Sequence, residues 1–256
     1  MSTLDVRPID IQATAALRAA FVASKPDWEA VCDAVLAGAD ANARLPARRR
    51  GVTALQIAVL YGFTPAVNTL LDCGADPAAG SERHSSALNA AVRLGFTAIA
   101  KALLEHGADP GAKDLDGRPP LMSAVRCGHT AIAKLLLDHG ADPNATDAEG
   151  QTTLMHVPDT AWSRIEGSEL IDLLVRRGAD PLARDALGRT TLSIFAKPRR
   201  WDLLSSLDIA LADPRQSAAR HRVLARLNAA QRHRWLPRST TAASASVARY
   251  HWNRHP

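Results

Sequence analysis

Aromatic residues, cysteine and lysine are scarce in this chain of 256 residues. Aromatic residues make up 4% of it, and there are three cysteines and five lysines beside 26 arginines. The hydrophobic content is still 46%. Because strands prefer β-branched and aromatic side chains, a core of closely packed helices is favoured over a β-sandwich. The excess of arginine and alanine favours a GC-rich genome and a bacterial source.

Cysteines and long apolar runs are too few for several classes of protein. Cys32, Cys73 and Cys127 form no spaced pair, so they suggest neither a disulfide framework nor a zinc site and favour a reducing compartment. No apolar run reaches the ~18 residues that cross a bilayer. The start of the chain lacks the basic and apolar regions of a signal peptide. We expect a cytoplasmic protein; the alternative is secretion without an N-terminal signal peptide.

Acidic residues are absent after Asp213, where nine arginines follow. Residues 1–213 carry 22 basic and 26 acidic side chains, a net charge of −4, so the net charge of +5 comes from the C-terminal segment. We predict a basic helix over 215–236, which could cap the preceding domain, and a disordered basic tail over 237–256. Nucleic acid or an anionic membrane is not a favoured partner, and would be bound only through this tail.

A repeat organises the middle of the chain. The tripeptide Gly-Ala-Asp begins at residues 38, 74, 107, 140 and 178, at intervals of 36, 33, 33 and 38 residues. Each copy is followed by a Thr-Pro-Leu-like start. The leucines of these starts are Leu55, Leu88, Leu121, Leu154 and Leu192. Two markers in step at a period near 33 residues indicate stacked repeats.

Residues 114–146, DLDGRPPLMSAVRCGHTAIAKLLLDHGADPNAT, resemble the ankyrin repeat most closely. The resemblance extends over residues 14–214, after an N-terminal extension of 1–13. It implies an all-α ankyrin-repeat solenoid, in which helix-turn-helix repeats joined by β-turn loops stack on one another. We expect about six repeats, counted from a degenerate N-terminal cap near 14–40, and a monomer.

Local signals agree with paired helices. Thr53, Ser86, Thr152 and Thr190 are placed to cap first helices, and Pro119 takes this place in the fourth repeat. Gly62, Gly95 and Gly128 suit the left-handed ends of these helices. Apolar residues Ile132, Leu135 and Leu136 mark one face of a second helix.

Two departures from the family pattern bear on the stack. Ankyrin repeats usually carry, after the leucine, a histidine that ties neighbouring loops together. Here the residues are Gln56, Asn89, Met122, Met155 and Ser193. We expect weaker loop ties in the fourth and fifth repeats, because methionine is a poor hydrogen-bonding group. Five extra residues follow Leu154, and Trp162 among them is either a contact anchor or a cover over a gap in the core.

Catalytic signals are missing from the sequence. It has no Gly-rich phosphate loop, no His/Cys cluster with metal spacing and no nucleophile elbow, so we expect no enzyme, cofactor or metal. His129 matches a structural histidine of the family. We expect Asp114, Asp116, Asp147 and Glu149 to be solvated turn residues rather than catalytic pairs.

Ankyrin-repeat proteins usually meet their partners with the loop tips and the exposed side of the first helices. By resemblance, the partner-binding residues here are Leu60, Tyr61, Arg83, His84, Arg93, Leu94, Lys113, Leu115, Arg118, Arg126, Cys127, Leu187 and Arg189. The arginines of the first loop either grip an acidic partner or phosphate, or lie on a solvated loop. They are Arg44, Arg48, Arg49 and Arg50.

The resemblance implies a non-catalytic protein-protein interaction module, acting as scaffold, adaptor or inhibitor, whose partner is another protein. One alternative is a secreted bacterial effector that binds a host protein, with the acid-free C-terminal segment as its delivery signal. A second is an immunity or regulatory protein for a cognate toxin. The sequence does not identify the partner.

Overall fold

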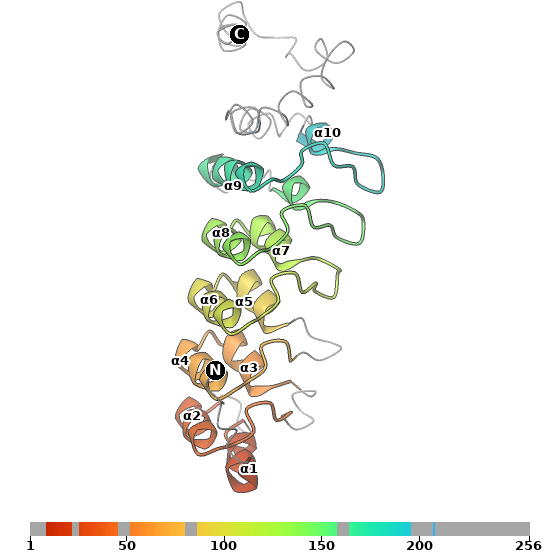
Figure 1. Cartoon of the computed structure of the whole chain (residues 1–256). Coiled ribbons are helices and arrows are strands. Elements are labelled where there is room, and N and C mark those ends of the chain that lie inside the picture. Colours follow the sequence, from red (N-terminus) through yellow and green to blue (C-terminus); the bar gives the residue numbers. More distant parts are fainter. Residues whose placement is uncertain are drawn as a thin grey trace, which may run out of the picture. The chain divides into compact units, whose positions relative to one another are not determined.

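A computed structural model describes residues 9–21, 26–45, 52–79, 86–157, 164–195 and 207, all within residues 1–210. The described helices alternate between two rows (Figure 1). We call the first the first-helix row. It contains α1 (Ile11–Ala19), α3 (Ala54–Leu60), α5 (Ala87–Leu94), α7 (Pro120–Arg126), the 3₁₀ helix η2 (Thr153–His156) and α10 (Thr191–Phe195). The second-helix row contains α2 (Trp28–Leu36), α4 (Thr64–Asp72), α6 (Thr97–Glu105), α8 (Thr130–Asp138) and α9 (Arg164–Arg176).

From α3 to α8, each helix packs on its partner within the repeat and on the equivalent helix of the next repeat. In the first-helix row α3 contacts α5, α5 contacts α7, and α7 contacts η2. In the second-helix row the contacts run from α2 through α4, α6 and α8 to α9. Among the described residues, strand pairing is limited to the isolated bridges Arg44–Thr53 and Thr146–Thr152. The prediction of an all-α stack of helical repeats is confirmed.

The core lies between the two rows and follows the repeat period. The leucines of the Thr-Pro-Leu-like starts are all buried, and burial of a leucine contributes about 1.5–3 kcal/mol. In α8 the buried residues are Ile132, Ala133, Leu136 and Leu137, while Leu135 is half-buried. Of the three residues predicted to form the apolar face, Ile132 and Leu136 are therefore buried and Leu135 lies at its edge.

The first helix begins earlier than expected. Asp10 caps α1 by accepting hydrogen bonds from the backbone N–H groups of Gln12 and Ala13, so the helix starts at Ile11 rather than near residue 14. The Thr14 hydroxyl accepts a 2.9 Å hydrogen bond from the backbone N–H of Asp40. This bond ties the helix to the end of its own repeat.

Side-chain caps explain where most first helices begin. Thr53 and Gln56 form a reciprocal capping box, and Ser86 accepts a 3.2 Å hydrogen bond from the backbone of Asn89. Thr190 accepts a bond of 3.3 Å from the N–H of Ser193. The prediction for Thr152 was wrong, because its hydroxyl makes no capping bond to η2. A single 3₁₀ turn does not offer the same backbone donors as an α-helix.

Gly62 and Gly95 end α3 and α5 under two constraints. Both are left-handed, with φ of +68° and +77°, as expected for these positions. A Cβ atom at Gly62 would lie 2.8 Å from the ring of Phe96, and one at Gly95 would lie 2.9 Å from the ring of His129. A ring from the following repeat therefore covers each glycine.

The fifth repeat departs from the others. Its first helix is reduced to the single turn of η2, while α9 has 13 residues where α4, α6 and α8 have nine. Proline disfavours the helical conformation of the preceding residue, and Val157, before Pro158, is extended with ψ of 122°. The helix therefore ends at His156. The inserted Trp162 lies outside the described residues.

Neighbouring loops are tied together without the family's histidine. Asn89 donates a 2.8 Å hydrogen bond to the carbonyl of Ala112 in the next loop, as its position suggested. Met122 and Met155 are simply buried. Other groups tie these later loops. The Lys113 ammonium donates to the carbonyl of Thr146 at 2.9 Å, and the backbone N–H of Ala186 donates to the carbonyl of Glu149 at 3.0 Å.

Asparagine side chains add a second kind of tie between repeats. Asn144 donates to the carbonyl of Gly178 at 2.9 Å and accepts from the backbone N–H of Asp180 at 2.7 Å. Asn42 forms the same pair of bonds with the Gly-Ala-Asp that begins at Gly74. Residues 215–236 and 237–256, for which a basic helix and a disordered tail were predicted, lie outside the described residues.

Membrane-spanning helices are not found in the part of the chain that the structure describes, where none is both long and apolar enough.

Candidate protein-binding surface

Three loop tips share one hydrogen-bonding plan: 114–118, 147–151 and 185–189. In each tip the first aspartate uses Oδ1 to accept backbone N–H groups two and four residues later, at 2.8 to 3.1 Å. The backbone of the same aspartate donates to the carbonyl of the fifth residue. Because one carboxylate oxygen satisfies two donors, the tips are built as rigid turns.

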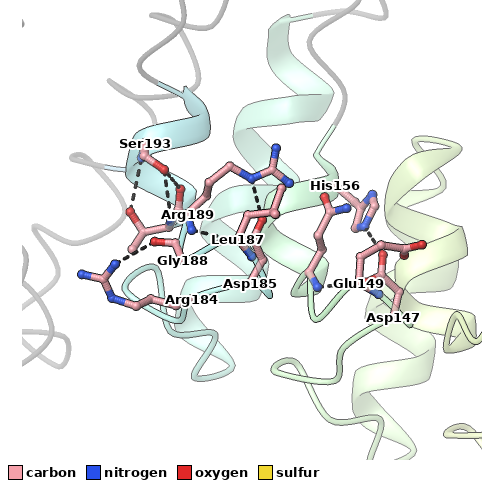
Figure 2. A network of polar contacts seen from close by, with 11 residues as sticks. Asp147, Glu149, His156, Arg184, Asp185, Leu187, Gly188, Arg189 and Ser193 are labelled. Atoms are coloured by element: carbon pink, nitrogen blue, oxygen red, sulfur yellow. Dashed lines mark hydrogen bonds and ion pairs between the residues drawn. The ribbon is translucent and has the colours of Figure 1, made fainter.

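The second oxygen of Asp147 is used by a histidine. His156, at the end of η2, places Nε2 2.9 Å from Oδ2 of Asp147 (Figure 2). The side chain of Asp147 is 2% exposed and that of His156 is 17% exposed. The shortened helix brings His156 onto the loop tip of its own repeat. This contact was not predicted, because His156 stands one residue after the position of the family's histidine.

Arginine takes the equivalent place in the next tip. Arg189 Nε donates to Oδ2 of Asp185 at 2.7 Å, and Arg184 donates to the carbonyl of Gly188 at 2.7 Å (Figure 2). The Asp185 side chain is buried. In the first of the three tips, Arg118 instead pairs with Asp116 at 2.6 Å.

Burial and charge shift two pKa values at these tips. Burial lowers the pKa of His156 below its ordinary value of 6.5; the hydrogen bond and charge of Asp147 oppose this, while the charges of Arg126 and Arg118 add to it. Burial alone would raise the pKa of Asp185. Hydrogen bonds from Arg189 outweigh that effect and hold the pKa below its ordinary value of 3.8.

The expectation of solvated turn residues was wrong for Asp147. It is buried because its carboxylate organises the turn, whereas Asp116 and Glu149 are exposed. The Asp147 carboxylate is occupied by backbone N–H groups and His156, and that of Asp116 by Arg118, which is a structural use. Among the described residues no group of three or more His, Cys, Asp or Glu side chains is placed to hold a metal.

The exposed ends of α3, α5 and α7 carry the most conspicuous surface residues. Leu60 and Tyr61 are each 49% exposed and Leu94 is 43% exposed, which is unusual for large apolar side chains. Arg93 and Arg126 are also exposed. Since α5 packs against both α3 and α7, these side chains lie on neighbouring helices of one row. We call these five residues the helix-end surface.

An aromatic cluster supports the N-terminal end of the helix-end surface. Trp28 stacks on Phe63 with ring centroids 5.2 Å apart, and meets the rings of Tyr61 and Phe21 edge to face at 5.7 and 5.9 Å. Such pairs contribute about 0.5–1.5 kcal/mol beyond the burial of their area. Tyr61 is therefore held in place while half of it faces solvent.

The remaining predicted site residues fall into four groups. Leu115 and Leu187 stand exposed on loop tips, and Cys127 is half-buried at the end of α7. Lys113, Arg118 and Arg189 make the hydrogen bonds described above, so part of their polar capacity serves the loops. Arg44 is exposed beside its bridge to Thr53. Arg48, Arg49, Arg50, Arg83 and His84 lie outside the described residues.

Comparison with known protein families decides the family. A model described as ankyrin repeats in three copies matches residues 18–114 and 88–158, which together span more than half of the chain. The chain belongs to the ankyrin-repeat family. Ankyrin repeats generally mediate protein-protein interactions, and the family is typically non-enzymatic. The matched region of this ankyrin-repeat protein ends at residue 158, beside the shortened η2. No curated protein matches the chain.

Sequence reasoning missed the aspartates that organise the loop tips. The signal was present, because Asp114, Asp147 and Asp185 each stand three residues before a glycine, at intervals of 33 and 38 residues. An aspartate repeated at the period of the fold indicates a structural role. The pairing of Asp147 with His156 had no such signal, since it depends on the shortened helix.

Proposed function

We propose that this ankyrin-repeat protein is a non-catalytic interaction module that binds a partner protein through its helix-end surface. The observation that supports this function is the exposure of Leu60, Tyr61 and Leu94 on adjacent first helices. Exposed apolar side chains that gather on one surface mark interaction sites more often than isolated ones do. Tyrosine and arginine are also enriched among the residues that dominate binding energies.

Two loop tips carry further exposed apolar residues. Leu115 and Leu187 are 65% and 75% exposed on turns that backbone hydrogen bonds hold rigid. A rigid apolar contact loses little conformational entropy on binding. We propose that these tips contribute secondary contacts in addition to those of the helix-end surface.

Affinity capture tests the function. The tagged full-length protein is used to capture partners from the native lysate, which are identified by mass spectrometry. We compare the wild type with a Leu60→Asp/Leu94→Asp variant. We expect a partner that the wild type retains and the variant loses, because buried carboxylates without partners oppose association.

The matched control changes two exposed aliphatic residues elsewhere. Ile11→Asp/Leu36→Asp introduces the same charge at residues that are 82% and 59% exposed, and it should retain the partner. Circular dichroism establishes that all three proteins are folded. Retention of the same partners by both variants would contradict the proposed surface.

A further inference from the structure

Charge is segregated between the two rows of helices. The described helices of the first-helix row contain Arg18, Arg93 and Arg126 and no aspartate or glutamate. Those of the second-helix row contain eight acidic and four basic residues. Residues 1–213 carry a net negative charge. The first-helix row is therefore basic within a region that is acidic as a whole.

Three loop-tip carboxylates are engaged within their own repeats. Asp147 and Asp185 are buried and engaged by His156 and Arg189, and Asp116 pairs with Arg118. Neither Arg93 nor Arg126 forms an ion pair with a carboxylate of the described residues, although both are exposed. Their guanidinium groups are available to an incoming ligand.

We propose that the helix-end surface docks an acidic segment of a partner protein, with carboxylates on Arg93 and Arg126 and apolar side chains on Leu60, Tyr61 and Leu94. The inference rests on the proposed function and names the chemistry of the partner. Arginine binds carboxylates in a bidentate manner and stays charged at any physiological pH.

The repeat fixes the spacing of the ligand's charges. Arg93 and Arg126 occupy equivalent positions on α5 and α7, and packed helices lie about 8–10 Å apart. The partner's carboxylates should be separated by a similar distance. One face of a partner helix supplies this separation between positions i and i+7, at about 1.5 Å of rise per residue.

The apolar residues distinguish a protein segment from a simple polyanion. A nucleic-acid backbone would use the arginines without needing Leu60, Tyr61 and Leu94 beside them. A protein segment uses both, because interfaces combine an apolar centre with charged residues around it.

A displayed library of random peptides, selected on the folded full-length protein, tests the proposal. We expect the enriched peptides to be rich in aspartate and glutamate and to contain leucine or aromatic residues. The most enriched peptide, made synthetically, should bind at least about tenfold more weakly to Arg93→Glu/Arg126→Glu, because its carboxylates would then face like charges. Its association rate with the wild type should fall as salt is added.

A control with the same change in net charge separates local contacts from general electrostatics. Lys101→Glu/Lys134→Glu alters two exposed residues of the second-helix row and should bind the peptide like the wild type. The proposal is overturned if the enriched peptides show no acidic excess, if no peptide is enriched, or if both charge reversals weaken binding equally. Binding of a labelled oligonucleotide that needs Arg93 and Arg126 but not Leu60 and Leu94 would also overturn it.

These outcomes are distinguishable from failure of the proposed function. Neutral peptides that depend on Leu60 and Leu94 would remove the acidic partner while supporting the surface. Loss of a captured partner by Leu60→Asp/Leu94→Asp, together with equal retention by Arg93→Glu/Arg126→Glu, would likewise support the surface and remove the acidic partner. If neither pair of changes affects any ligand, both proposals fail.

Discussion

The fourth and fifth repeats carry the same sequence markers but fold differently. In the fourth repeat a seven-residue helix, α7, precedes the nine-residue α8. In the fifth, four residues of 3₁₀ helix precede the 13-residue α9. Leu121 and Leu154 are nevertheless both completely buried. The comparison shows that the leucine sets the register of the stack, while the length of the first helix is a separate property that Pro158 limits.

The two repeats also stabilise their loop tips differently. Asp114 is half-buried and its Oδ1 accepts only backbone N–H groups, whereas Asp147 is buried and additionally binds His156. Where the regular repeat uses a helix, the fifth uses a pair of polar side chains across a shortened turn. The fifth repeat should therefore depend more on polar contacts and less on the packing of its first helix.

The largest expected effect comes from removing the buried leucines. Leu121→Ala should lower the free energy of unfolding by about 2–5 kcal/mol, as is usual for such cavities. Leu154→Ala should cost less, because a single 3₁₀ turn can collapse more easily around the cavity than α7 can. Urea denaturation monitored by circular dichroism measures both. An equal or greater loss for Leu154→Ala would mean that the short turn is as firmly packed as the helix.

Removing a loop-tip aspartate should destabilise the protein more in the fifth repeat than in the fourth. Asp147→Ala leaves the backbone N–H groups of Glu149 and Gln151 and the half-buried His156 without their acceptor, and should cost about 1–3 kcal/mol. Asp114→Ala should cost less, because water can reach its half-buried tip. A double-mutant cycle with His156→Ala isolates the side-chain pair. A coupling energy of zero between Asp147 and His156 would show that the histidine adds nothing.

Asparagine ties between repeats should give an effect of about 1 kcal/mol. Asn144→Ala removes two hydrogen bonds between the fourth and fifth repeats and should destabilise the protein by that amount. Ala78 is the equivalent residue at a junction without the tie, and Ala78→Asn should add about 0.5 kcal/mol. Thermal unfolding of the two variants checks both signs. No change in either would place the stability of the junctions in the helices alone.

The smallest expected effect is the pH dependence of the fifth repeat. The pKa of His156 is lower in the folded protein than its ordinary value of 6.5, so the unfolded chain takes up the proton first. Stability should therefore fall as the pH drops below 6.5, until the folded protein is protonated as well. The free energy of unfolding, measured against pH, should fall less for His156→Gln than for the wild type. His139→Gln, at the exposed end of α8, is the control and should lose stability at low pH as the wild type does. Equal curves for all three proteins would show that His156 does not cause the pH dependence.

The fold was largely predictable because it depends on a periodic pattern. The leucine and Gly-Ala-Asp markers gave the register, and residues such as Thr53, Ser86 and Gly62 gave the helix ends from local chemistry. The extent of the first helix in the fifth repeat was missed, although Pro158 was visible. Thr152 signals the start of a helix, while Pro158 disfavours the helical conformation of Val157 before it, and the two signals compete over a few residues.

The candidate surface was predictable only as far as family positions allow. Exposure of Leu60, Tyr61 and Leu94 follows from their place at helix ends. Lys113 engages the carbonyl of Thr146 in the next repeat, which the sequence of its own repeat cannot show. Arg118 and Arg189 engage carboxylates of their own loop tips, and these contacts depend on how each tip folds. The segregation of charge between the rows became visible only once each helix was assigned to its row.

The glycines at the ends of α3 and α5 also bear on how such an array changes over evolutionary time. Gly62 accepts a phenylalanine ring from the next repeat and Gly95 accepts a histidine ring, so the same small residue receives two different neighbours. A duplicated or transplanted regular repeat would bring a ring that the glycine of the preceding repeat can accommodate. The junction between regular repeats therefore tolerates a change of ring, provided that the glycine which faces the ring is kept.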